Sequence, residues 1–597
     1  MSDPTSQANH TEIFTEHCAF KWNVDFTNKK LTGSVTHDLH VAKDGVREVI
    51  FDTADLDIYS VEVEGNTVSY EVKAKHPIMG SALHIPLPSV LKSGSSIKVL
   101  INYQTTKDYT PRLLFYFSLT EVGWEIVTFT DKVKSLLSWF GTGNTWVLTG
   151  QSLNETYPFQ LLMKKDFSLS TSVRLNPIQD SPSVKIKYSA EVTSVLPALM
   201  SAIRQSPPST GLAHDGRVIG KDEVTYAYHQ PIPIPSYLIA IAAGNVVYRP
   251  FPRHLGKAWT CGIWTEPELI EDAYWEFSED TSRFLASAEE IVVPYRFGVY
   301  DLLVLPPSFP YGGMENSCLT FLTPTLLAGD RTLVDAITHE LTHSWFGNGV
   351  TCKSQGSYNE GWTTYIKRLL LQVLHSPADR GFSFIIGYKA LQDDLEMYAD
   401  KPKYQCLVIE FEKGEDPDDA YSTIPYNKGA NLILHLERTL GGLDVFLPYV
   451  RDYMSTFMGK GIMTQEWKEH LYTYYEKNGR AEKIKALDSA WFYGEGLKLP
   501  VKMEYESTLA ESAYRLAERW DSSLVFLERL QSYKPLSSSH VEHLASLYKV
   551  SATHNAEIRL RFYQFSLVDP TSPAAQKYAV EAADWVIVGE LGWLLAG

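Results

Sequence analysis

Residues 338–345 read Thr-His-Glu-Leu-Thr-His-Ser-Trp, and this stretch decides how the rest of the chain is interpreted. In a helix, His339 and His343 project from the same face, one turn apart. Two imidazoles placed in this way can share one zinc ion at about 2.0–2.1 Å each. Glu340 then lies beside the metal without being a ligand, where it can take a proton from a water molecule. The stretch therefore predicts two metal ligands and a general base.

A helix is expected over this motif. Thr332 can cap its first turn, with Asp335 three residues later as in a capping box. Gly347 is a plausible C-terminal stop. Apolar residues recur at helical spacing, at Ile337, Leu341 and Trp345. The alternative is that two histidines lie four residues apart on a buried helix by chance.

A third ligand is required, because a catalytic zinc usually keeps three protein ligands and one open position. Glu360, in Asn-Glu-Gly-Trp at 359–362, is the first acidic residue after Glu340. Upstream, Glu315 follows two glycines, which let the backbone approach a ligand closely. On its own, Glu315 could equally be a solvated loop carboxylate.

Three segments in this order resemble the M1 family of zinc aminopeptidases. They are Gly-Gly-Met-Glu-Asn at 312–316, His-Glu-x-x-His-Ser-Trp at 339–345 and Asn-Glu-Gly-Trp at 359–362. Residues 312–329 and 416–429 look most like the leukotriene A4 hydrolase and aminopeptidase B branch. The resemblance covers residues 10–105 and 178–575 in approximate terms.

The resemblance implies a multi-domain α+β protein. We expect an N-terminal β-sheet domain over 1–250, a thermolysin-like zinc peptidase domain over 251–498 and a shortened, solenoid-like α-helical domain over 505–597. The residues agree with this order. Valines around Gly65-Asn66 predict a hairpin, and the apolar run over 237–247 indicates a buried strand. Val184, Ile186 and Tyr188 alternate with Lys185 and Lys187, which indicates a half-exposed strand.

The roles of the catalytic residues follow from the resemblance, position by position. His339, His343 and Glu360 match the ligands of one zinc ion, and Glu340 matches the general base. Tyr426 matches the tyrosine whose hydroxyl stabilises the oxyanion. Without the resemblance, Tyr426 would be an ordinary packing residue.

The substrate-binding residues are likewise implied. Glu315 matches the carboxylate that grips the free α-ammonium of a peptide, which limits the family to one N-terminal residue at a time. Asp418 and Tyr421 match residues tied to epoxide opening and to the hydrophobic arm of the site in the leukotriene A4 hydrolase branch. The remaining substrate-binding candidates are Gly312, Gly313 and Met314.

We therefore expect a zinc aminopeptidase that hydrolyses short peptides through an activated water, with leukotriene A4-type epoxide hydrolysis as a further activity. The alternative is a catalytically impaired relative that acts as a binding protein or is a non-functional product. A zinc endopeptidase is a third hypothesis. Glu315 argues against it, because its charge selects a free amine over an extended chain.

The chain departs from the family pattern in three places. The connection between His343 and Glu360 has sixteen residues, fewer than in the family. If two residues were lost from the helix, the face with Glu360 would turn by about 200°; Gly356 and Ser357 favour a loss from the loop instead. Residues 106–177 do not match, and Gln160 is the nearest candidate for the family's ammonium-binding glutamine. The tail 586–597 has no Lys or Arg, so we expect no carboxylate clamp.

Composition limits the partners. The net charge of −17 argues against nucleic-acid binding, which needs a basic surface. No apolar run is long enough to span a bilayer, and five scattered cysteines favour a reducing compartment. We expect a monomeric protein of the cytoplasm, or of the nucleus as well, whose partner is a peptide or small lipid substrate.

Overall fold

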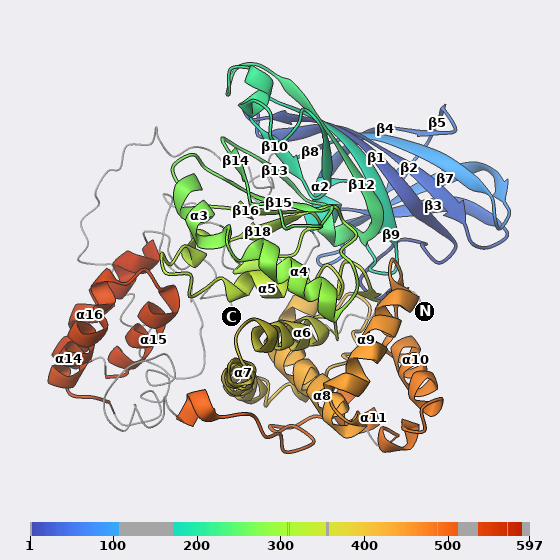
Figure 1. The fold of residues 1–597 in the computed structure, drawn as a ribbon. Helices are drawn as coiled ribbons and strands as arrows, with labels where there is room; N and C mark the ends of the chain where they lie inside the picture. Colours follow the sequence, from blue (N-terminus) through green and yellow to red (C-terminus); the bar gives the residue numbers. More distant parts are fainter. Residues whose placement is uncertain are drawn as a thin grey trace.

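The computed structural model describes residues 3–106, 171–306, 309, 311–353, 358–485, 488–511, 535–569 and 571–587. Strands come first along the chain, then a region of mixed helices and strands, then helices (Figure 1). This order confirms the predicted α+β fold class. The domain boundaries near residues 250 and 500 stay predictions.

The N-terminal region is built on an eight-stranded sheet in the order β11-β12-β9-β1-β2-β8-β4-β5. All neighbours are antiparallel except β1 and β9, which run parallel. A three-stranded sheet, β3-β7-β6, accompanies it. The strands are β1 (Ile13–Asp25), β2 (Lys30–Val41), β3 (Val46–Thr53), β4 (Leu56–Val63), β5 (Asn66–Val68), β6 (Glu71–Val72), β7 (Ser81–Leu91), β8 (Ser96–Thr105), β9 (Lys185–Ser194), β11 (Ile203–Ser206) and β12 (Val224–Pro235).

The expected hairpin is present, with its turn one residue earlier than predicted. Glu64 and Gly65 both have positive φ, and Val63 pairs with Asn66. Val72, which follows the hairpin, lies on β6 and pairs with β7 in the three-stranded sheet. On β9 the alternation is confirmed, because Ile186 and Tyr188 are buried while Lys187 is exposed.

The middle region contains a five-stranded sheet, β14-β15-β16-β18-β17, covered by helices. Its strands are β14 (Val247–Pro250), β15 (Thr260–Thr265), β16 (Val299–Val304), β17 (Gly313–Met314) and β18 (Leu319–Leu322). The short helix α2 (Thr171–Leu175) belongs to the N-terminal region, between β8 and β9. The helices of the middle region are α3 (Ile270–Phe277), α4 (Thr281–Ile291), α5 (Asp335–Thr342), α6 (Tyr358–Leu374), α7 (Pro377–Met397), α8 (Ile424–Leu440), α9 (Leu443–Phe457), α10 (Thr464–Glu476) and α11 (Asp488–Phe492). Helices α4 and α5 lie between this sheet and α6 (Figure 1). The site residues therefore sit where α5, α6 and the sheet edge meet.

The prediction of one buried strand over 237–247 is wrong. A 3₁₀ turn, Ser236–Leu238, comes first, followed by the short strand β13 (Ile241–Ala243), which pairs with β10 (Ala198–Met200). Among the described residues, no helix is long and apolar enough to cross a membrane. The five cysteines are free.

The first two regions share one continuous hydrophobic core, which runs from Ile13 on β1 to Phe492 on α11. The last region has a separate core, built by α14 (Ser538–Tyr548), α15 (Ala556–Ser566) and α16 (Pro573–Ile587). Asn555 caps α15, because its side chain accepts from the Ile558 amide. Most of the tail 586–597 lies outside the described residues.

Candidate metal and substrate site

The metal-site helix α5 is shorter than the sequence suggests. It begins at Asp335, whose charge favours a helix N-terminus, and the expected cap at Thr332 is wrong because Val334 precedes the helix without a side-chain cap. The helix ends at Thr342, before the expected stop at Gly347. His343 nevertheless keeps helical angles (φ −56°, ψ −24°), so it still lies one turn from His339.

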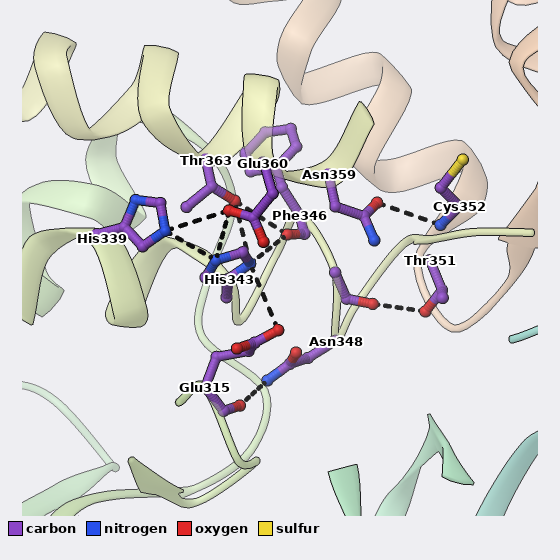
Figure 2. Close-up of polar contacts among 11 residues, drawn as sticks. Glu315, His339, His343, Phe346, Asn348, Thr351, Cys352, Asn359, Glu360 and Thr363 are labelled. Carbon is purple, nitrogen blue, oxygen red and sulfur yellow. Dashed lines mark hydrogen bonds and ion pairs between the residues drawn. The ribbon is translucent and has the colours of Figure 1, made fainter. Parts of the chain in front are cut away.

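Three side chains converge on one point (Figure 2). The Nε2 atoms of His339 and His343 are 3.1 Å apart. Glu360 Oε2 lies 3.2 Å from the first and 3.3 Å from the second. Donors on three corners of a regular tetrahedron around an ion about 2.0–2.1 Å away would be about 3.3–3.4 Å apart. Glu360 Oε2 is buried and lies within ion-pair distance of both imidazole nitrogens. These donors therefore fit a zinc ion.

Glu360 reaches this point although its connection to His343 is short. Helix α6 begins at Tyr358, and Glu360 lies in its first turn on the side that faces the two histidines. The alternative in which the face is turned away does not describe this structure. The loop residues to which we ascribed the loss, Gly356 and Ser357, lie outside the described residues.

The two histidines and the carboxylates at this point shift one another's pKa. Burial lowers the pKa of His339 to about 4. Burial alone would also lower the pKa of His343, but the carboxylates of Glu360 and Glu315 raise it to about 10. Burial alone would raise the pKa of Glu360, but the two histidines hold it well below its usual range. A metal ligand must be a neutral imidazole, so binding of zinc would displace the proton that His343 otherwise holds.

Two neighbours that the sequence did not single out orient His343. Its Nδ1–H donates to the Phe346 carbonyl at 3.0 Å. Thr363, one turn after Glu360 on α6, donates its hydroxyl to the same carbonyl at 3.0 Å (Figure 2). Such partners fix the ring orientation and leave Nε2 free for the metal. The spacing of Glu360 and Thr363 on one helix face was the signal that could have indicated this role.

The predicted base, Glu340, lies against the strand β17. A Cβ on Gly313 would come within 2.4 Å of Glu340 Oε1, so glycine is what allows the two to approach. Burial raises the pKa of Glu340 to about 8. Gly312 and Met314 belong to the same edge, where the Gly312 carbonyl accepts from Thr323 and Met314 pairs with β18.

Glu315 lies on the side of His343 opposite Glu360 (Figure 2), with its Oε1 3.9 Å from His343 Nδ1. Burial raises the pKa of Glu315, although the charge of His343 opposes the shift. Its backbone carbonyl accepts a hydrogen bond from Asn348 Nδ2 at 2.8 Å (Figure 2). Asn348 was missed in the sequence, where it is only the second residue of a Gly-Asn pair after the motif.

The tyrosines complete the site. The ring of Tyr426, in the first turn of α8, stacks on His339 with ring centroids 5.7 Å apart. Burial raises the pKa of Tyr426 well above its usual value, so its hydroxyl stays a proton donor. Tyr421 interacts with Tyr426, and its backbone amide donates to the Asp418 carbonyl at 3.1 Å. Burial raises the pKa of Asp418 to about 6. Gln160 lies outside the described residues.

Comparisons with known proteins agree with this geometry. A model of the peptidase family M1 domain matches residues 275–491, and a model of the C-terminal domain of leukotriene A4 hydrolase matches residues 520–590. The leucine aminopeptidase 2 of Pyricularia oryzae is 33% identical over 97% of this chain and 90% of its own. The leukotriene A-4 hydrolase of Xenopus laevis is 33% identical over 95% and 89%.

The fold comparison gives the same result. The structure of yeast LTA4 hydrolase in complex with bestatin matches 99% of this chain and 91% of its own, with a TM-score of 0.79 and 28% identity. The structure of the native yeast enzyme matches 98% and 90%, with a TM-score of 0.77. The likeness therefore extends over the whole order of β-rich, mixed and helical regions.

Proposed function

The chain belongs to the M1 family of zinc metallopeptidases, in the leukotriene A4 hydrolase branch, and we propose that it removes single residues from the N-terminus of short peptides. One observation carries the proposal. The three-ligand group of His339, His343 and Glu360 lies directly beside two further carboxylates, Glu340 and Glu315. A metal, a base and an anchor for an amine are what a single-residue aminopeptidase needs.

His339, His343 and Glu360 would hold the zinc ion. A bound zinc ion would lower the pKa of a water molecule to about 7 and polarise a carbonyl group. Glu340 takes the proton of the attacking water and returns it to the leaving amine, a task suited by a pKa raised toward neutrality. The Tyr426 hydroxyl donates to the oxygen on which negative charge develops.

Glu315 sets where the peptide begins. Its carboxylate pairs with the free α-ammonium of the substrate, since a buried anion needs a cation or donor as partner. Because Glu315 and Glu340 approach the same histidine, the amine and the attacked carbonyl are held within one residue of each other. An endopeptidase would have to place a neutral peptide group where this charge lies.

Epoxide hydrolysis is a second candidate activity. It is favoured by the position of Asp418 beside Tyr421, and relatives bear the name leukotriene A-4 hydrolase. The impaired relative was suggested by the short connection before Glu360 and by the expected absence of a C-terminal carboxylate clamp. The group formed by His339, His343 and Glu360 speaks against the first reason, and most of the tail to which the second reason refers lies outside the described residues. A monomeric state and a cytoplasmic location stay predictions.

The test is metal analysis beside a base variant. We expect one zinc per chain and hydrolysis of an aminoacyl arylamide that a chelator stops. Glu340→Gln should lower turnover by about 10²–10⁴-fold while zinc stays bound, and Glu290→Gln, at an exposed position on α4, should change nothing.

Each of the other results has a distinct meaning. Unchanged turnover in Glu340→Gln would refute the base. A protein that takes up no zinc at saturation would favour the impaired relative. Equal hydrolysis of the N-acetylated substrate would favour an endopeptidase. Failure of Asp418→Asn to alter hydrolysis of a lipid epoxide would exclude the second activity at that residue.

A further inference from the structure

Lys185, the first residue of β9, reaches out of the N-terminal sheet to the turn that follows the metal-site helix. Its ammonium donates to the backbone carbonyls of Asn348 and Gly349, at 2.8 Å each. The sequence pattern predicted a half-exposed side chain, like that of Lys187 two residues on. Lys187 is exposed, whereas Lys185 is half-buried and spans the two regions of the chain.

The turn 347–350 is closed against a second support on its other side. The Gly349 carbonyl also accepts from the Gly459 amide at 2.9 Å, and Thr351 donates to the Lys460 carbonyl at 3.1 Å. A Cβ on Gly349 would lie 2.7 Å from Met458 Sδ. The turn is therefore held between Lys185 and the 458–460 loop.

Asn348 connects this turn to the substrate end of the site. Its backbone amide donates to the His343 carbonyl at 2.9 Å, and its side chain donates to the Glu315 carbonyl at 2.8 Å. The side chain is buried, and its Oδ1 has no partner in the part of the chain that the structure describes. Among the described residues, the side-chain amide of Asn348 is therefore oriented by its hydrogen bond to the Glu315 carbonyl.

We propose that Lys185 is a positioning residue for Glu315, acting through the turn 347–350 and the side chain of Asn348. The inference rests on the proposed function, in which Glu315 binds the α-ammonium of the substrate. Lys185 fixes the Asn348 backbone, Asn348 fixes the Glu315 backbone, and the carboxylate then meets the amine in one place. A small displacement of the Glu315 carboxylate would weaken its bond to the substrate amine, because that bond depends on the relative position of the two groups.

The cost of placing a lysine here supports this role. Desolvation lowers the pKa of Lys185 to about 7. No acidic group pairs with it among the described residues, so two neutral carbonyls alone compensate its charge. An apolar side chain would pack at this place without that cost, but it would remove the Lys185 donor from the Asn348 carbonyl and leave the Gly349 carbonyl with the Gly459 amide.

The experiment compares Lys185→Met with Lys187→Met in the full-length zinc enzyme. We expect Lys185→Met to raise KM for L-leucyl 4-nitroanilide by about 5–10-fold, the effect of a lost hydrogen bond. Turnover should stay within about twofold and the zinc content should not change, because neither Glu340 nor the ligands contact Lys185. The exposed Lys187→Met should behave as wild type.

A merely structural role would give a different pattern. It would lower the midpoint of unfolding and the active fraction, and thus turnover, with KM unchanged, and this result would overturn the proposal. If Lys185→Met does not fold, Asn348→Leu decides. It removes the donor to the Glu315 carbonyl and keeps the backbone carbonyl that Lys185 binds, so KM should rise at constant turnover, and an unchanged KM contradicts the proposal.

A double variant separates this inference from the proposed function. If Lys185 acts through Glu315, adding Lys185→Met to Glu315→Gln should change kcat/KM by less than about twofold, because coupled positions are not additive. Additive losses would overturn the inference alone. If Glu315→Gln itself leaves KM unchanged in an active zinc enzyme, the assigned role of Glu315 fails, and the proposal for Lys185 fails with it.

Discussion

The metal end of the site (His339, His343 and Glu360) and the end proposed to bind the amine (Glu315 and Asn348), here called the amine end, differ in the sequence separation of the residues that build them. At the metal end, His339, His343 and Glu360 lie on two successive helices, α5 and α6, and contact one another directly. At the amine end, Glu315 precedes these helices, and its support passes through Asn348 to the N-terminal sheet. The metal end is therefore built within one stretch of the chain, whereas the amine end depends on contacts with the N-terminal sheet.

The two ends also treat their carboxylates in opposite ways. Burial raises the pKa of both Glu360 and Glu315, but direct contact with two histidines reverses the shift at Glu360 only. Glu360 is thus kept ionised as a metal ligand must be. Glu315, 3.9 Å from His343, lacks a partner of that strength, and a cationic amine would supply one. The two carboxylates are therefore suited to different cations, a metal ion at Glu360 and, as proposed, an amine at Glu315.

The largest effect should come from breaking the metal end. Glu360→Ala removes one of three ligands, and we expect zinc to be lost on dialysis and arylamide hydrolysis to fall to background. Elemental analysis and a rate measurement check both. Glu482→Ala, at an exposed position, is the control. Retention of one tightly bound zinc would show that another residue closes the site.

The next largest effect is expected at Tyr426, which stacks on His339 at the metal end. Tyr426→Phe removes a hydroxyl donor and keeps the ring that stacks on His339. Turnover should fall by about 10²–10³-fold, while zinc content and KM stay near wild type, because the donor acts where charge develops in the reaction. Tyr493→Phe, at an exposed position, should have no effect. A raised KM with unchanged turnover would move Tyr426 from catalysis to substrate binding.

A smaller effect is expected at the amine end. Glu315→Gln keeps the shape and removes the charge, so KM for substrates with a free amine should rise by about 10–100-fold through the lost charge-assisted bond. Zinc content should not change. The ratio of rates for the free and the N-acetylated substrate measures the same loss. If that ratio survives in Glu315→Gln, selection of the amine lies elsewhere in the chain.

These two ends explain what the sequence could predict. The metal end follows from helical spacing, so His339, His343 and Glu340 could be proposed from a few residues. Glu315 and Tyr426 needed the family resemblance, because a loop carboxylate and a buried tyrosine carry no pattern of their own. Thr332 failed as a cap, since local capping propensity did not decide where α5 begins.

Long-range contacts could not be predicted at all. The alternation at 184–188 correctly gave a strand with one buried face, yet it assigned Lys185 to solvent. Only the tertiary arrangement brings the turn 347–350 beneath that lysine. The hairpin at Glu64-Gly65 shows the same limit on a smaller scale, because the pattern found the turn and missed its register by one residue.

The smallest effect concerns the charge that supports the amine end. The pKa of Lys185 is about 7 in the folded chain, below the value of about 10.4 for an unfolded lysine. Between these values the unfolded chain binds more protons, so this residue makes the folded protein more stable as pH rises from about 7 to 10. Below pH 7 both states are protonated and the cost of burying the charge is fully present.

Lys185→Met has no side chain that titrates at this position. The stability of wild type relative to the variant should therefore increase between pH 7 and pH 9, by about 1 kcal/mol once screening at a half-buried side chain is allowed for. Urea midpoints of both proteins at several pH values measure the difference, and Lys187→Met should run parallel to wild type. A difference that stays flat or shrinks with rising pH would mean that the ammonium remains solvated. The amine end would then be held by Asn348 and the 458–460 loop without the N-terminal sheet.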